Sequence, residues 1–163
     1  MDALRRMLML RESLSWTEAA NTLTESGEHF DAATLLRLLA FELALKALVE
    51  QYTTSQAPKH HRYAEIFKLL PDDIQRRLLE VAGERIGPSR LGRDANAVLE
   101  ELGENFKGLR YPWERYAGLS EEQYSRLGQD WIAAGAQTDH AAFRFYPEEL
   151  FGLTYAARHL AGC

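Results

Sequence analysis

The fold is decided by the stretch Leu35–Val49, which reads LLRLLAFELALKALV. Twelve of its residues are apolar, and only Arg37, Glu42 and Lys46 interrupt them. A segment that is apolar around most of a helical circumference belongs inside a bundle of helices. We therefore expect residues 30–52 to form the central helix of the fold, with its three charges spread over more than one narrow stripe.

Apolar residues recur at helical spacing on both sides of this stretch, and no alternating run is long enough to predict a strand. A first helix should begin near the N-terminus and end before Gly27, with Ser15 and Glu18 forming a capping box. The polar loop 53–58 ends the central helix. Pro71 should then break or restart the helix that follows the loop.

The second half of the chain predicts a further helix that Asp94 caps and Gly108 stops. Extra short helices are expected after it. Ser120 with Gln123 forms a capping signature, residues 124–127 and 131–136 are predicted to be short helical segments, and Pro147 should open a final helix. The expected fold class is an all-α, up-and-down helical bundle with these extra short helices at its C-terminal end.

The 163 residues suit one helical domain, residues 1–163. The 19 basic and 24 acidic residues give a net charge of -5, which argues against electrostatic binding of nucleic acid over the whole protein surface. A local basic patch is still compatible with this balance.

Cys163 is the only cysteine, so an intrachain disulfide and a metal site with four thiolate ligands are both excluded. The apolar run Met7–Leu10 ends at Arg11 and Glu12 and is too short for a signal core or a membrane span. Glycine-rich phosphate loops and His-Glu-x-x-His are also missing from the sequence. We expect a cytoplasmic protein with no membrane segment, no metal and no cofactor.

The first candidate site is Lys59–Arg62, which places His60 and His61 beside two cations at the start of a helix. Imidazoles exchange protons near neutral pH, which is what general acid or base catalysis requires. The plainer interpretation is that one histidine packs and the other is solvated. Only one of the two is expected to face inward.

The second candidate is Glu42 with Lys46, four residues apart in the order that stabilises helices. The pair could lie on the surface. If it faces inward among its apolar neighbours, it needs a further polar partner. We expect Arg110 and Glu114 to supply that partner.

The third candidate is the segment Leu109–Tyr116, in which Arg110, Tyr111 and Glu114 surround Pro112. Pro112 favours an extended turn at this point. Arg110 could clamp a carboxylate or phosphate bidentately while Glu114 holds it in place. Alternatively, the two form a structural ion pair that locks the turn onto the bundle.

Taken in order, these features resemble the HEPN superfamily of small helical-bundle domains, over a core of about residues 30–116. The resemblance is carried by three groups of residues: Phe41–Leu48, His60–Tyr63 with Leu69 and Leu70, and Asn105–Phe106 with Arg110–Glu114. It implies a bundle that commonly forms homodimers, found among RNA-cleaving toxins, toxin-antitoxin pairs, phage-defence proteins and stress-response partners.

Many active members of that superfamily cleave RNA with an arginine followed after four to six residues by a histidine. No arginine of this chain is followed by a histidine at that interval. The catalytic pair of the superfamily therefore cannot be transferred to any position of this sequence.

Two hypotheses result. In the favoured one the chain is a noncatalytic binding and dimerisation module, with a pocket for a protein partner or for a nucleotide or RNA. Its pocket residues are Glu42, Lys46, Arg110, Tyr111 and Glu114. In the alternative it is a divergent metal-independent endoribonuclease, with His60 or His61 as general acid or base and Arg110 stabilising the phosphorane. The acidic net charge favours the first.

Overall fold

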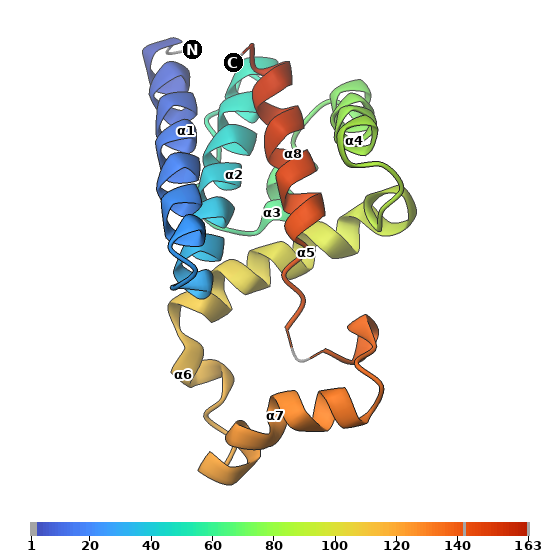
Figure 1. Cartoon of the computed structure of the whole chain (residues 1–163). Helices are drawn as coiled ribbons and strands as arrows, with labels where there is room; N and C mark the ends of the chain where they lie inside the picture. The colour runs from blue at the N-terminus through green and yellow to red at the C-terminus, as the bar shows by residue number, and fades with distance from the viewer. Residues whose placement is uncertain (1–2, 142, 163) are drawn as a thin grey trace.

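The computed structural model describes residues 3–141 and 143–162, and Cys163 lies outside them (Figure 1). The described residues contain eight α-helices, one 3-10 turn and no strand, which confirms the all-α helical bundle. The helices are α1 (Ala3–Glu25), α2 (Phe30–Tyr52), α3 (Tyr63–Phe67), α4 (Asp72–Ile86), α5 (Leu91–Arg110), α6 (Pro112–Arg115), α7 (Glu121–Ala133) and α8 (Pro147–Leu160), with the 3-10 turn at Thr138–His140.

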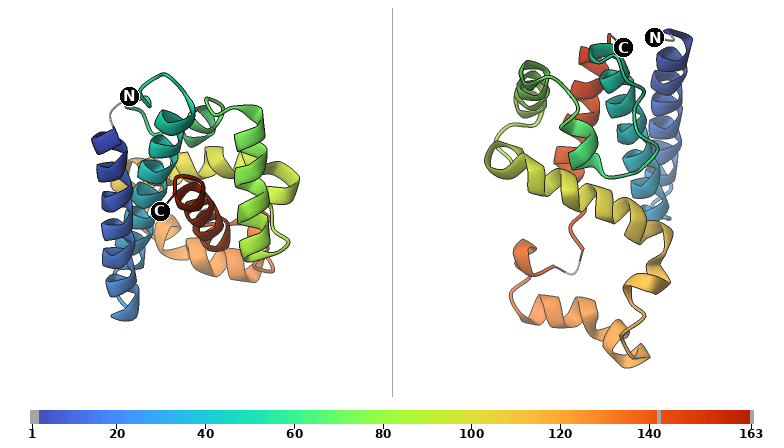
Figure 2. Two further views of the ribbon diagram at one scale, coloured as in Figure 1. Left: turned by 90° about the horizontal axis from the view of Figure 1, so that it is seen from above. Right: turned by 180° about the vertical axis from the view of Figure 1, so that it is seen from behind.

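Helix α2 has the predicted bounds and the central place. Seen from above, it lies between α1 and α8, while α4 covers the other side of α8 (Figure 2). Leu38, Phe41, Leu45 and Leu48 are fully buried along it. Each such side chain contributes roughly 1.5–3 kcal/mol on leaving water, so the apolar run stabilises the whole bundle.

Helix α1 is continuous, so the capping box predicted at Ser15 and Glu18 is wrong. Its inner face packs along α2 through the buried residues Met9, Ser13 and Ala20. The Ser13 hydroxyl donates to the carbonyl of Ala40 at 2.6 Å. These contacts with α2 extend on both sides of Ser15, which sits exposed in mid-helix.

Helix α5 departs from its predicted end. Asp94 does cap its main part, because its backbone is extended and its carboxylate accepts from the Ala97 amide at 3.0 Å. Gly108 does not stop the helix, which continues to Arg110. Pro112 follows directly and opens α6, a single helical turn in place of the extended turn that we predicted.

Residues 112–141 and 143–145, here called the arm, leave the bundle below α5 and return to it at α8 (Figures 1 and 2). Within the arm, Ser120 and Gln123 form the predicted capping box, and α7 is one helix where two short pieces were expected. No helix among the described residues combines the length and the apolar composition that crossing a membrane requires.

Candidate functional site

Glu42 and Lys46 face inward from α2. The Lys46 ammonium lies 2.7 Å from Oε1 of Glu42, and only 12% and 4% of the two side chains are exposed. A buried carboxylate without partners would cost several kcal/mol. Both charges therefore need the contacts that fix them here.

The second oxygen of Glu42 is bound by His61. Nδ1 of the imidazole lies 2.7 Å from Oε2, and a carboxylate only accepts, so Nδ1 carries the hydrogen. Nε2 of His61 has no partner among the residues that the structure describes, and 43% of the side chain is exposed. Glu42 thus fixes the tautomer and orientation of an accessible imidazole.

Helix α5 passes very close to the backbone around His61. A Cβ on Gly103 would lie 3.0 Å from the His61 carbonyl oxygen and 3.3 Å from the Tyr63 nitrogen, so only glycine fits without displacement. One turn further along α5, the Phe106 ring packs against the His61 ring with centroids 4.6 Å apart. The approach of α5 therefore sets the position of the imidazole.

Tyr63 closes the buried side of this cluster. It is fully buried, and its hydroxyl donates to the Leu38 carbonyl at 3.2 Å. Burial raises the pKa of Tyr63 well above its usual range, and the neighbouring Glu42 carboxylate raises it further, while Arg110 opposes the shift. Tyr63 is accordingly a neutral hydrogen-bond donor at physiological pH.

Arg110 is held by aromatic rings at the end of α5. Its guanidinium lies 5.2 Å from the centroid of Phe106 and 5.0 Å from that of Tyr111, and it donates to the Tyr111 hydroxyl at 2.7 Å. His61 and Arg110 therefore contact the same Phe106 ring. Both also line a cavity of about 610 Å³ between α3 and α5.

This cavity, here called the α3–α5 pocket, has a mixed charged lining. Its charged side chains besides His61 are Arg62, Glu65, Lys68, Glu100, Glu104, Lys107 and Arg110. Arg62 pairs with Glu65 at 2.9 Å, and Glu100 accepts from Asn96. Among the described residues, no carboxylate forms an ion pair with Lys68, Lys107 or Arg110.

The other predicted site residues lie elsewhere. Glu114 is exposed on α6 and, with Tyr111, lines a smaller cavity of about 380 Å³. Within the described part of the chain, neither Arg110 nor Glu114 forms an ion pair with Glu42 or Lys46, and the expected partner is replaced by His61. The helical turn at Pro112 gives the segment a different path from the extended turn that was predicted.

His60 lies apart from Glu42. Its Nδ1 accepts from the Arg62 amide at 3.2 Å, and its Nε2 lies 3.7 Å from Glu65. His60 thus belongs to the local turn before α3. His61 is the histidine that reaches the buried Glu42, although its side chain is 43% exposed against 32% for His60.

The sequence reasoning missed Lys107 and Lys68. Gly103, Lys107 and Arg110 are spaced four and three residues apart, so one face of α5 carries all three. That spacing was the available signal for Lys107. In the part of the chain that the structure describes, no three histidine, cysteine, aspartate or glutamate side chains gather as a metal site would require.

Comparison with protein families matches the HEPN domain to residues 7–130. The match contains the core of residues 30–116 and also most of α1, which the resemblance did not cover, while α8 lies beyond it. Comparison with curated proteins and with solved structures gave no match. Since the matched segment is well over half of the chain and folds as an all-α bundle, the chain belongs to the HEPN domain family.

Proposed function

We propose that this HEPN domain is a noncatalytic binding module whose α3–α5 pocket takes a nucleotide-like anion. The observation that carries this proposal is that three of the four cations of the pocket form no ion pair among the described residues. These cations are Lys68, Lys107 and Arg110, while Glu65 is paired with Arg62 and Glu100 accepts from the neutral Asn96. A phosphate group complements such a set of cations.

The rings beside these cations add a second means of recognition. Phe106 and Tyr111 hold the Arg110 guanidinium in place, so little side-chain freedom is lost when an anion binds. The net charge of -5 restricts attraction of a phosphate to a local patch of this kind. A mononucleotide or a short single-stranded RNA fits this description better than a long duplex.

A titration with fluorescent ATP and with a fluorescein-labelled oligoribonucleotide, both followed by anisotropy in EDTA, tests the proposal. We expect Lys107→Ala and Arg110→Ala each to weaken binding by about tenfold, the usual size of one charge-assisted contact. Arg126→Ala on α7 is the matched control, because Arg126 is an exposed cation outside the pocket. Equal affinities for all four proteins, or no binding by the wild type, would refute the pocket.

A metal-independent endoribonuclease is the second candidate, and one observation favours it. The Glu42 carboxylate orients His61, whose Nε2 has no partner among the described residues, beside Arg110 on the same Phe106 ring. In such a reaction Nε2 would take the proton of an RNA 2′-hydroxyl as its oxygen attacks phosphorus, and Arg110 would stabilise the phosphorane charge. The P–O5′ bond would then break, leaving a 2′,3′-cyclic phosphate, and the departing 5′-oxygen would take a proton from water. The absence of the family's Arg-x(4-6)-His spacing places this second.

Gel electrophoresis of the same labelled oligoribonucleotide, after incubation with the protein in EDTA, separates the two candidates. An intact oligoribonucleotide after long incubation in EDTA supports the binding module. Cleavage that His61→Ala abolishes and His60→Ala spares would establish the nuclease instead.

We further propose that the domain is a homodimer working in a toxin-antitoxin, phage-defence or stress-type system. Membership of a family whose domains often dimerise is the basis for this part of the proposal. Sedimentation velocity of the purified chain tests the homodimer directly.

A further inference from the structure

The apolar face of α7 is not covered by the bundle. Tyr124, Leu127 and Trp131 are spaced three and four residues apart, which places them on one face of the helix. None of the residues of α7 is buried. On this face Tyr124 is 53% exposed and Leu127 and Trp131 are half-buried, and Ile132, at the edge of the face, is 66% exposed. Helix α7 stays exposed because it lies below α5, away from the helices of the bundle (Figure 1).

The arm is nevertheless built as an ordered element. The capping box of Ser120 begins α7, and the Trp131 indole donates to the Gln137 carbonyl at 2.8 Å beyond its end. Asp139 is bound by Arg90 at 2.9 Å, which fastens the arm to the first turn of the α5 region. An exposed apolar face on an element held in this way is typical of an interaction surface.

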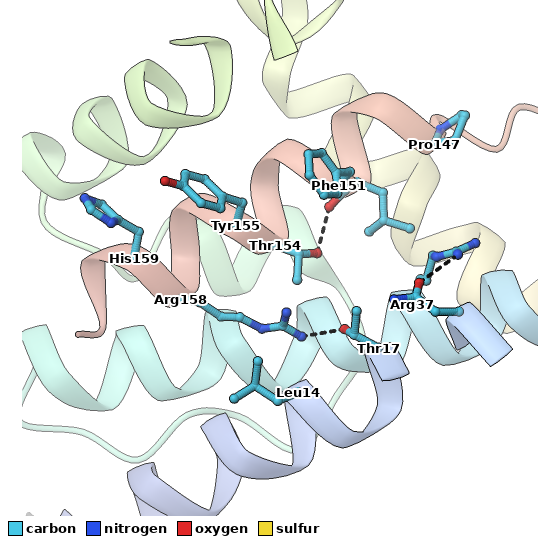
Figure 3. Close-up of a pocket in the computed structure, with 11 residues that line it drawn as sticks. Leu14, Thr17, Arg37, Pro147, Phe151, Thr154, Tyr155, Arg158 and His159 are labelled. Atoms are coloured by element: carbon cyan, nitrogen blue, oxygen red, sulfur yellow. Dashed lines mark hydrogen bonds between the residues drawn. The ribbon is translucent and has the colours of Figure 1, made fainter. Parts of the chain in front are cut away.

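A second apolar surface lies on the bundle itself. A groove of about 620 Å³ runs between α1, α2 and α8 (Figure 3), and we call it the α1–α8 groove. Leu14, Phe151 and Tyr155 line it and are 41%, 53% and 39% exposed. The groove therefore offers aromatic and aliphatic contact area to a helix.

The two surfaces carry opposite charges. Around the groove, Arg37 bonds only to the neutral Asn21 and Thr24 within the described residues, and the Arg85 guanidinium lies over the Phe151 and Tyr155 rings. Helix α7 carries three carboxylates, Glu121, Glu122 and Asp130, and one cation, Arg126. Arg126 pairs with Glu122, which leaves Glu121 and Asp130 without an ion pair in the described part of the chain.

We propose that α7 of one copy docks into the α1–α8 groove of a second copy, and that the exchange is reciprocal. Both surfaces belong to this chain and complement each other in apolar character and charge, but α5 lies between the arm and the bundle that holds the groove (Figures 1 and 2). The two surfaces therefore meet only between molecules. A reciprocal exchange closes into a two-fold dimer, whereas a one-sided contact would continue into a chain of molecules.

This inference rests on the proposed homodimer and names its contact surfaces. The test is sedimentation velocity over a range of concentrations, with circular dichroism to verify folding. The arm variant is Ile132→Arg and the groove variant is Phe151→Glu, both at exposed side chains. Leu69→Arg is the matched control, because Leu69 is 50% exposed but lies outside α7 and the groove.

We expect the wild type and Leu69→Arg to dimerise, and Ile132→Arg and Phe151→Glu each to raise the dissociation constant of the dimer by at least about tenfold. Mixing the arm and groove variants should restore association. One contact in the mixed dimer is intact, and the other opposes the introduced arginine to the introduced glutamate.

The possible failures are distinguishable. A wild type that stays monomeric refutes the homodimer and the exchange together. A dimer that survives both substitutions leaves the homodimer standing and refutes the exchange. Variants that weaken the dimer but fail to complement each other in the mixture refute the reciprocal arrangement.

Discussion

Glu42 on α2 and Glu122 on α7 are both helical glutamates with a cation four residues later, yet their surroundings differ completely. Glu42 and Lys46 are 4% and 12% exposed and 2.7 Å apart. Glu122 and Arg126 are 79% and 63% exposed and 3.5 Å apart. The same pattern thus marks the centre of a buried polar cluster in the bundle and an ordinary surface pair on the arm, and the neighbouring residues decide which.

Removing each glutamate tests this contrast most strongly. Glu42→Ala should lower the free energy of unfolding by about 3 kcal/mol, because the enclosed Lys46 ammonium and the His61 Nδ1–H lose their acceptor. Glu122→Ala should change it by less than about 0.5 kcal/mol, as for other exposed pairs. Urea unfolding of both variants makes the comparison. Similar losses for the two would contradict the structural difference.

Glycine to alanine substitutions should have opposite signs in the two regions. Gly103→Ala should cost about 2 kcal/mol, since its Cβ would meet the backbone of His61 and Tyr63, which cannot turn aside. Gly128→Ala lies in the middle of α7 with nothing within 4 Å of its Cβ, and should favour the helix by about 0.5–1 kcal/mol. Unfolding curves measure the first effect, and hydrogen exchange along α7 measures the second.

Tyr63→Phe should cost about 1 kcal/mol through loss of the hydrogen bond to Leu38. It should also change the dependence on alkaline pH. The pKa of Tyr63 is raised in the folded state above its ordinary value of 10.0, so its contribution is complete below that value and is lost as pH rises toward the folded-state pKa. Stability measured between pH 8 and 11 should therefore fall less steeply in Tyr63→Phe than in the wild type.

The smallest effect on the whole molecule is expected for Ser120→Ala. Loss of the capping box should weaken α7 locally by about 1 kcal/mol. The global unfolding free energy should barely change, because α7 contributes no buried residue to the core. Faster hydrogen exchange confined to residues 121–133 would agree with this, and a large shift of the urea midpoint would contradict it.

The bounds of α2 were predictable because its signal is local and repeated over many residues. The capping box at Ser120 was likewise predictable, whereas the same motif at Ser15 was misleading. The difference is tertiary, since α1 packs along α2 on both sides of Ser15 and α7 packs on nothing that could prolong it.

The site was predictable only in part. That Glu42 and Lys46 could face inward follows from the apolar residues around them. Their contact with His61 depends on how closely α5 approaches the segment before α3, and that approach is set by Gly103, a residue with no functional pattern of its own. The path of Glu114 depended on Pro112 opening a helix, which proline permits as readily as an extended turn.

The hydrogen bond between Arg158 of α8 and Ser13 of α1 bears on how the chain folds during translation. Arg158 donates to the Ser13 hydroxyl at 2.8 Å, and α8 fills the space between α2 and α4 (Figure 2). Helix α8 is therefore translated after the other helices described here, and it covers one apolar side of α2. Until the arm and then α8 have been translated, that side of α2 lacks its cover, and the incomplete chain exposes apolar surface of the kind that favours aggregation.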